Sequence, residues 1–94
     1  MEIEQRIYHA DRAREVLENE AFIGAIADIK SEITEQWTKS PARDQEGREK
    51  LWLMLSLVKK LEDTLRMTFD SGKLAKLDLE HKRTMQQRLN DALR

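Results

Sequence analysis

The two histidines are the side chains of this sequence best suited to acid–base or metal chemistry, and neither has a second histidine at metal-ligand spacing. His9 follows Tyr8, and His81 has Asp78 three residues before it. An Asp and a His on one helical turn can polarise a base or hold a metal, but they are only part of a site. The chain has no Glu-x-x-His motif of the kind found in di-iron bundles, and it has no cysteine. We therefore expect no metal and no cofactor.

Nucleophilic and phosphate-binding motifs are missing as well. The glycines (Gly24, Gly47, Gly72) stand apart, so the sequence has no glycine-rich phosphate loop. No serine lies in a nucleophile-elbow sequence, and the carboxylates are dispersed along polar helix faces. A helical chain of 94 residues also seldom forms a substrate pocket within one copy. The sequence predicts a protein that is not an enzyme and has no small-molecule substrate.

Basic residues near the C-terminus are the candidates for nucleic-acid contact. Those considered are Lys76, Lys82, Arg83 and Arg88. Acidic residues interrupt them, no aromatic residue follows Phe69 to stack on bases, and the net charge of −1 gives no overall basic field. Nucleic-acid binding therefore stays as an alternative function.

The segment Leu51–Val58 is the most informative part of the chain. Seven of its eight residues are apolar, whereas a helix that buries one face needs only about half. Leu51, Met54, Leu55 and Val58 can serve an intramolecular core, while Trp52 and Leu53 point elsewhere. Either neighbouring helices cover both sides of the segment, or its outer residues form a binding patch. We predict these anchors for a partner or oligomer interface: Phe22, Trp37, Trp52, Leu53 and Leu57.

Composition and apolar periodicity predict an all-α fold, a long helical hairpin or a three-helix bundle that self-associates. Charged residues make up 37% of the chain and aromatic residues 5%, and Leu, Ile, Val and Phe together are 22 of 94 residues. Such a chain has a thin core, so burial against another copy or a partner would help it. One domain, residues 1–94, is expected, with helices over 2–38, 44–71 and 73–92 and short connections near 39–43 and 71–73.

Individual residues define the ends of these predicted helices. Pro41 stops the first helix, and Gly72 follows the C-terminus of the second. Asp44 is the expected N-cap of the second helix, with a start at Ser40 and Pro41 as the first helical residue as the alternative. The apolar stripe of the first helix changes direction near Asn19. The helix therefore kinks or restarts there, or its two halves pack on different partners.

Charge is distributed unevenly along the chain. Residues 1–37 contain nine acidic and four basic side chains, and residues 51–94 contain nine basic and six acidic ones. The two halves could attract each other within one copy or between copies. The N-terminus has no apolar signal region, and no apolar run approaches the roughly 18 residues of a membrane span. We expect a soluble intracellular protein with no membrane partner.

Several blocks of sequence resemble a family of small helical proteins encoded by tailed bacteriophages and prophages. The blocks are Arg12–Phe22, Trp37, Pro41–Trp52 and Gly72–Ala75, and Pro41–Trp52 is the most specific. Genes of that family lie among head and packaging genes, and no activity is attached to them. The resemblance implies a role in virion morphogenesis and a location in the host cytoplasm or in the virion. It supplies no catalytic residues.

Together these observations predict a non-enzymatic protein–protein interaction module. It would be a phage virion assembly component or minor structural component that binds itself, as a homo-oligomer, or another phage protein. One alternative is a nucleic-acid-binding packaging accessory or small regulator that uses the basic last helix. Another alternative is a phage inhibitor of a host protein.

Overall fold

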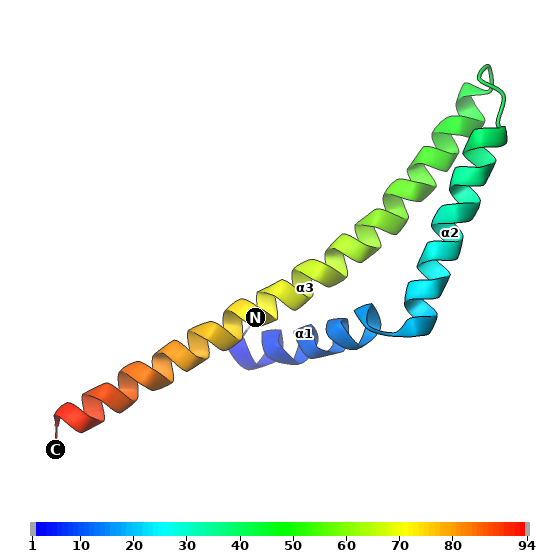
Figure 1. Cartoon of the computed structure of the whole chain (residues 1–94). Helices are drawn as coiled ribbons and strands as arrows, with labels where there is room; N and C mark the ends of the chain where they lie inside the picture. Colours follow the sequence, from blue (N-terminus) through cyan, green and yellow to red (C-terminus); the bar gives the residue numbers. More distant parts are fainter. Residues whose placement is uncertain (1, 94) are drawn as a thin grey trace.

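The computed structural model describes residues 2–93, and their regular structure consists of α-helices alone, so the all-α prediction is confirmed. Helix α1 spans Ile3–Leu17, α2 spans Glu20–Lys39 and α3 spans Gln45–Ala92. Figure 1 shows α3 running the length of the molecule, with α2 beside its first half and α1 against its middle. Each of the shorter helices therefore packs on a different part of α3.

Helices α1 and α2 are separate because the chain restarts at Asn19. Asn19 has an extended backbone (φ −73°, ψ 120°), and its Oδ1 accepts a hydrogen bond of 3.0 Å from the Phe22 N–H. This side chain satisfies one of the donors that a helix start leaves unpaired. The single helix expected over residues 2–38 is thus two helices. The change of apolar direction near Asn19 coincides with the break between them.

The connection between α2 and α3 is stabilised at both of its ends. Asp44 caps α3, as predicted, because its Oδ1 accepts a hydrogen bond of 3.1 Å from the Gly47 N–H. Arg48 reaches back from α3 to Ser40, where it donates to the carbonyl oxygen at 3.4 Å and to Oγ at 3.3 Å. The same guanidinium lies 4.1 Å from the centre of the Trp37 ring, a cation–π contact. Arg48 therefore ties the end of α2 to the start of α3.

Helix α3 continues through Gly72, so the predicted break at residues 71–73 is wrong. No glycine has the positive φ angle that a helix-terminating glycine adopts. Instead, Gly72 lets α1 approach closely: a Cβ at this position would lie 1.9 Å from the Cβ of Ala10. Ala10, Ala13 and Ala75 are buried around it. Small side chains on both helices set the distance between them, and the glycine serves packing rather than termination.

Polar contacts accompany this close packing of α1 on α3. The Arg6 guanidinium donates from Nε to the Ser71 Oγ at 3.1 Å and from a terminal nitrogen to the Ser71 carbonyl oxygen at 3.0 Å. Asp11 and Lys76 form an ion pair at 3.4 Å. Together with the alanines, these contacts fix α1 across the middle of α3.

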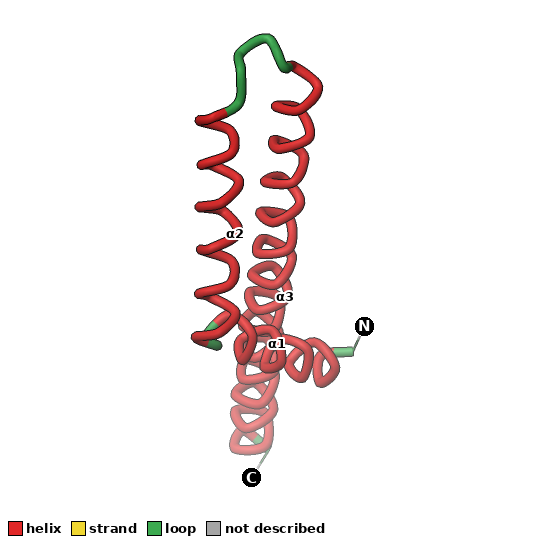
Figure 2. Tube along the Cα trace, turned by 90° about the vertical axis from the view of Figure 1, so that its right-hand side faces the viewer, coloured by secondary structure: helices red, strands yellow, loops and turns green. Residues whose placement is uncertain are grey.

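Helix α2 packs antiparallel to the first half of α3, as Figure 2 shows from the side. Ile26 and Ile33 are buried at this contact. Lys30 forms an ion pair across the two helices with Glu62, at 2.5 Å. The hairpin of the prediction is therefore the pair α2 and α3.

The molecule is long and thin. Its extents are 77 × 25 × 17 Å, and its radius of gyration is 21.3 Å, against about 12 Å for a compact chain of this length. The buried apolar residues of the described chain are few: Ala10, Ala13, Ile26, Ile33 and Ala75. No helix in residues 2–93 is both long and apolar enough to cross a membrane. This thin core leaves much apolar surface without an intramolecular partner.

Candidate protein-binding surface

Four large apolar side chains of α3 form an exposed row, which we call the α3 stripe. Leu53, Met54, Leu57 and Leu61 are 50%, 50%, 67% and 48% exposed. Leu53, Leu57 and Leu61 are four residues apart, so they lie one above another on the helix, and Met54 lies beside them. A run of exposed leucine on one helix face is typical of a protein-binding surface.

The α3 stripe continues into the part of α3 that α1 covers. Leu65 is four residues after Leu61 and is half-buried, as is Thr68, and Gly72 is buried under Ala10. Helix α1 therefore covers the lower part of this face and leaves its upper part bare. The stripe is exposed because α1 crosses α3 rather than running alongside the α2–α3 hairpin (Figure 2).

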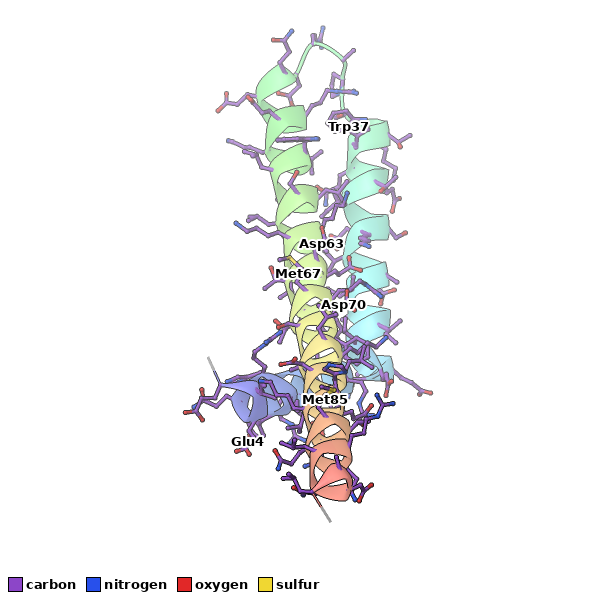
Figure 3. All side chains as sticks on the ribbon, turned by 90° about the vertical axis from the view of Figure 1, so that its left-hand side faces the viewer. Glu4, Trp37, Asp63, Met67, Asp70 and Met85 are labelled. Atoms are coloured by element: carbon purple, nitrogen blue, oxygen red, sulfur yellow. The ribbon has the colours of Figure 1, made fainter. Side chains whose placement is uncertain are left out.

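The two tryptophans gather at the loop end of the hairpin. Trp37 and Trp52, 37% and 59% exposed, line the same two shallow hollows, one of them together with Arg48. Figure 3 labels Trp37 at this end, far from Met85 in the last part of α3. The tryptophans therefore form an aromatic cluster that is distinct from the α3 stripe in its residues and in its place on the hairpin.

The five predicted interface residues thus divide into three groups. Leu53 and Leu57 belong to the α3 stripe, and Trp37 and Trp52 belong to the aromatic cluster. Phe22 is half-buried near the start of α2, where it lines a hollow with residues of α1 and α3. The structure does not bring them into one patch.

Two members of the α3 stripe were missed from the sequence. Met54 was assigned to the intramolecular core, but half of it is exposed because α2 packs on the neighbouring face of α3. Leu61 lies outside the segment Leu51–Val58, although its spacing of four residues from Leu57 could have identified it.

The last part of α3, residues 80–93, extends past both other helices, and we call it the α3 tail. Every residue of the tail is exposed. Its apolar side chains include Met85 and Leu89, 52% and 55% exposed, and they follow Leu74 and Leu77, which are also exposed. Isolated helices of this length are marginal in water, because most helix stability in proteins comes from packing. The tail is therefore a helical segment with little intramolecular packing.

The basic residues considered for nucleic-acid contact do not form one strip. Lys76 pairs with Asp11, and Lys82 pairs with Asp78, each at 3.4 Å. Lys82 and Arg83 are successive residues, so they point about 100° apart around the helix. Because of its ion pair with Lys82, Asp78 is paired with a lysine rather than with His81. The tail thus presents mixed charge instead of a phosphate-binding groove.

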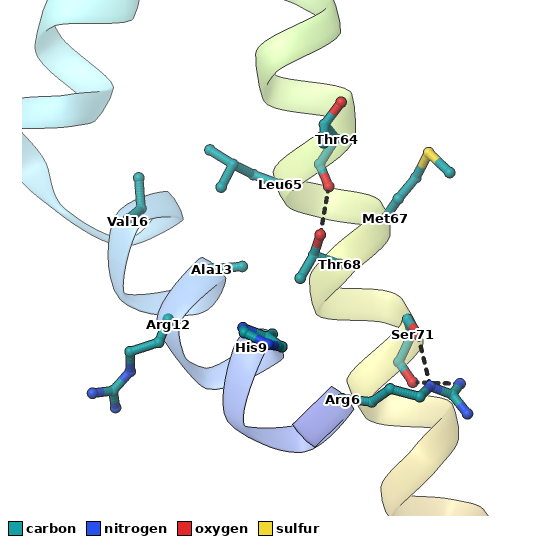
Figure 4. Close-up of a pocket in the computed structure, with 10 residues that line it drawn as sticks. All are labelled: Arg6, His9, Arg12, Ala13, Val16, Thr64, Leu65, Met67, Thr68 and Ser71. Carbon is teal, nitrogen blue, oxygen red and sulfur yellow. Dashed lines mark hydrogen bonds between the residues drawn. The ribbon is translucent and has the colours of Figure 1, made fainter. Parts of the chain in front are cut away.

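A hollow of the described chain lies between α1 and α3. Its volume is about 620 Å³, and Figure 4 shows Arg6, His9, Leu65 and Ser71 among the residues that line it. The hollow is open to solvent, and the Arg6 guanidinium is already occupied by Ser71. Within residues 2–93, no three histidine, aspartate or glutamate side chains come together as metal ligands. The hollow therefore gives no set of convergent polar groups to which a reaction could be assigned.

Comparison with known proteins adds no relative. No protein-family model, no curated protein and no solved structure matches this chain. The surface of α3 is therefore the basis of the functional argument.

Proposed function

We propose that this chain is a non-enzymatic helical protein–protein interaction module that self-associates and acts in the assembly of a tailed-phage particle. The α3 stripe is the observation that carries the proposal. Its four apolar residues are about half or more exposed, on the helix that holds the other two together. The free energy falls when a protein partner covers side chains of this kind.

The total surface supports the same interpretation. The chain exposes 7801 Å², whereas a compact monomer of 11.1 kDa exposes about 5,700 Å². The excess of roughly 2,100 Å² per chain lies within the range that stable permanent complexes bury on each partner. An extended chain with a thin core is thus suited to completing its core in an assembly.

The mechanism would combine apolar burial with charge complementarity. Leu53 and Leu57 would supply contact area near the centre of the interface, and the aromatic cluster could extend the contact toward the hairpin loop. Residues 1–37 have a net negative charge and residues 51–94 a net positive charge. These opposite charges would favour one orientation of the partner over others. No step of this mechanism requires a cofactor or a metal.

The context of phage assembly comes from the sequence resemblance. The block Pro41–Trp52, which carries most of that resemblance, contains the Asp44 cap and the Arg48 contact to Ser40. It thus forms the turn of the hairpin and the start of the helix that bears the stripe. A role as an assembly component or minor structural component agrees with a surface that is built for binding.

A complementation experiment tests this function. A tailed phage whose copy of this gene is disrupted should give fewer complete particles, and the wild-type chain should restore the particle number. The variant Leu53→Ser, Leu57→Ser should not restore it, whereas Ile23→Ser, which changes an exposed apolar residue of α2, should. A normal particle number without the chain, or full rescue by the stripe variant, would show that the proposed function is wrong.

A further inference from the structure

We infer that the α3 stripe is the docking site for the α3 tail of a second copy of this chain. This inference rests on the proposed function and specifies its partner. The stripe lies on the first half of α3 and the tail is the last part of the same helix, so one molecule carries both halves of the contact. Contacts of this kind either close by reciprocal exchange between two copies or continue around a ring.

The spacing of the α3 stripe recurs in the tail, where one histidine and two apolar residues hold the matching positions. Leu53, Leu57 and Leu61 occur at intervals of four residues, and His81, Met85 and Leu89 repeat the same intervals further along the helix. The two sets are 28 residues apart, which is four heptads, so in a helix that supercoils around a partner each residue of one set has the same heptad position as its counterpart in the other. Leu57 and Met85 are the central members, and they oppose each other whichever way the tail runs.

The length of the tail also fits the stripe. Residues 80–93 span about 21 Å at 1.5 Å per residue, and the stripe from Leu53 to Leu61 spans about 12 Å. The tail can therefore cover the whole stripe: with Met85 opposite Leu57, it extends one residue beyond the stripe at one end and four residues at the other. Because every residue of the tail is exposed in its own copy, docking would displace no buried residue.

Charge favours the tail over other occupants of the stripe. Helix α2, which lies beside the stripe-bearing half of α3, has four acidic and two basic residues, and the tail has three basic and two acidic residues. Among the ion pairs of residues 2–93, none includes Asp28 or Glu32 of α2, and none includes Arg83 or Arg88 of the tail. The opposite net charges of α2 and the tail therefore favour the approach of two copies at long range, rather than through ion pairs at the stripe.

The amount of exposed surface agrees with a second copy as the partner. A standard interface buries about 800 Å² on each chain, and permanent ones bury more. One tail and one stripe from each copy would account for such an area within the roughly 2,100 Å² by which this chain exceeds a compact monomer. A larger partner is not needed to cover the surface.

Cysteine cross-linking tests the inference directly, because the wild-type chain has no cysteine that could interfere. The variants Leu57→Cys and Met85→Cys are prepared separately, and one of them carries a cleavable tag that changes its mass. After mixing and mild oxidation, the predicted product is a disulfide-linked pair containing one chain of each variant. A third variant, Ile23→Cys, is the matched control, and it should not link to Met85→Cys.

Each outcome decides the question. A mixed Leu57–Met85 pair as the main product supports the inference. Main products that link position 85 to position 85, or position 57 to position 57, overturn the inference, because tails would then contact tails, or stripes would contact stripes. A chain that stays at 11.1 kDa across a concentration series also overturns it. The proposed role in particle assembly, though not self-association in the case of a chain that stays at one copy, would survive these failures if the wild-type chain, but not the stripe variant, still restored particle assembly.

Discussion

Gly72 of α3 lies directly beneath Ala10 of α1, so closely that a Cβ on residue 72 would be 1.9 Å from the Ala10 Cβ. The added Cβ of residue 72 would also lie 3.2 Å from the Arg6 carbonyl oxygen, so both the backbone and a side chain of α1 fill this space. This contact sets the distance between α1 and α3. It also determines which part of the α3 face α1 covers and which part remains as the stripe.

Gly72→Ala should therefore destabilise the protein, although alanine is the better helix former by about 1 kcal/mol. The new methyl group cannot be accommodated unless α1 moves away, and overpacking of this kind costs about 1–3 kcal/mol. Chemical denaturation should show the loss, and amide exchange should become faster throughout α1 while α2 retains its protection.

Gly24→Ala is the matched control for this substitution. A Cβ at residue 24 would have nothing within 4 Å, so only the helix preference of alanine remains. The free energy of unfolding should rise by up to about 1 kcal/mol. Equal effects at the two glycines would contradict the close approach of α1.

The two functions of glycine explain why Gly72 was misread from the sequence. A glycine after Ser71 is typical of a helix end, but a glycine inside a helix also allows another helix to approach. Which applies depends on Ala10, which is 62 residues away in the sequence. By contrast, the Asp44 cap depends on residues within three positions, and it was predicted correctly.

The candidate surface, like the helix ends, could be predicted from the sequence only in part. The excess of apolar residues in Leu51–Val58 identified Leu53 and Leu57, because a helix face needs fewer apolar residues than this segment has. Whether another helix covers them depends on the angle at which α1 crosses α3, which local sequence does not set. For the same reason, Met54 was assigned to the core and is exposed.

Asp44→Ala should lower the free energy of unfolding by about 1 kcal/mol, because the first turn of α3 then loses its hydrogen-bond acceptor. Asp44→Asn keeps an acceptor oxygen and should retain most of the stability. Urea denaturation of the three proteins measures the difference. Equal losses for alanine and asparagine would show that the Asp44–Gly47 hydrogen bond does not stabilise the helix.

Arg48→Lys should loosen the turn of the hairpin. Lysine cannot reproduce the planar stacking on Trp37 together with the two hydrogen bonds to Ser40. We expect a loss of about 0.5–2 kcal/mol and a change in tryptophan fluorescence, since one of the two tryptophans loses its neighbour. Arg43→Lys, at an exposed position of the same turn, is the control and should change neither quantity. An unchanged spectrum for Arg48→Lys would contradict the stacking.

Substitution by alanine should lower the free energy of unfolding much more at a core residue than at a residue of the α3 stripe. Ile33 is 4% exposed, so Ile33→Ala should cost about 2–4 kcal/mol. Leu57 is 67% exposed, so Leu57→Ala should change the stability of the dilute monomer by no more than about 0.5 kcal/mol. Thermal unfolding at low protein concentration checks both values. A large loss at Leu57 would place it in the intramolecular core.

The central claim is that the α3 stripe is a surface that another copy covers. Light scattering after size exclusion, across a series of protein concentrations, tests it most directly. The wild-type chain should rise above the 11.1 kDa of one copy as concentration increases, whereas Leu53→Ser, Leu57→Ser should stay at 11.1 kDa with unchanged helical circular dichroism. A wild-type chain that remains at the mass of one copy throughout, or a stripe variant that associates as well as the wild type, would contradict the account.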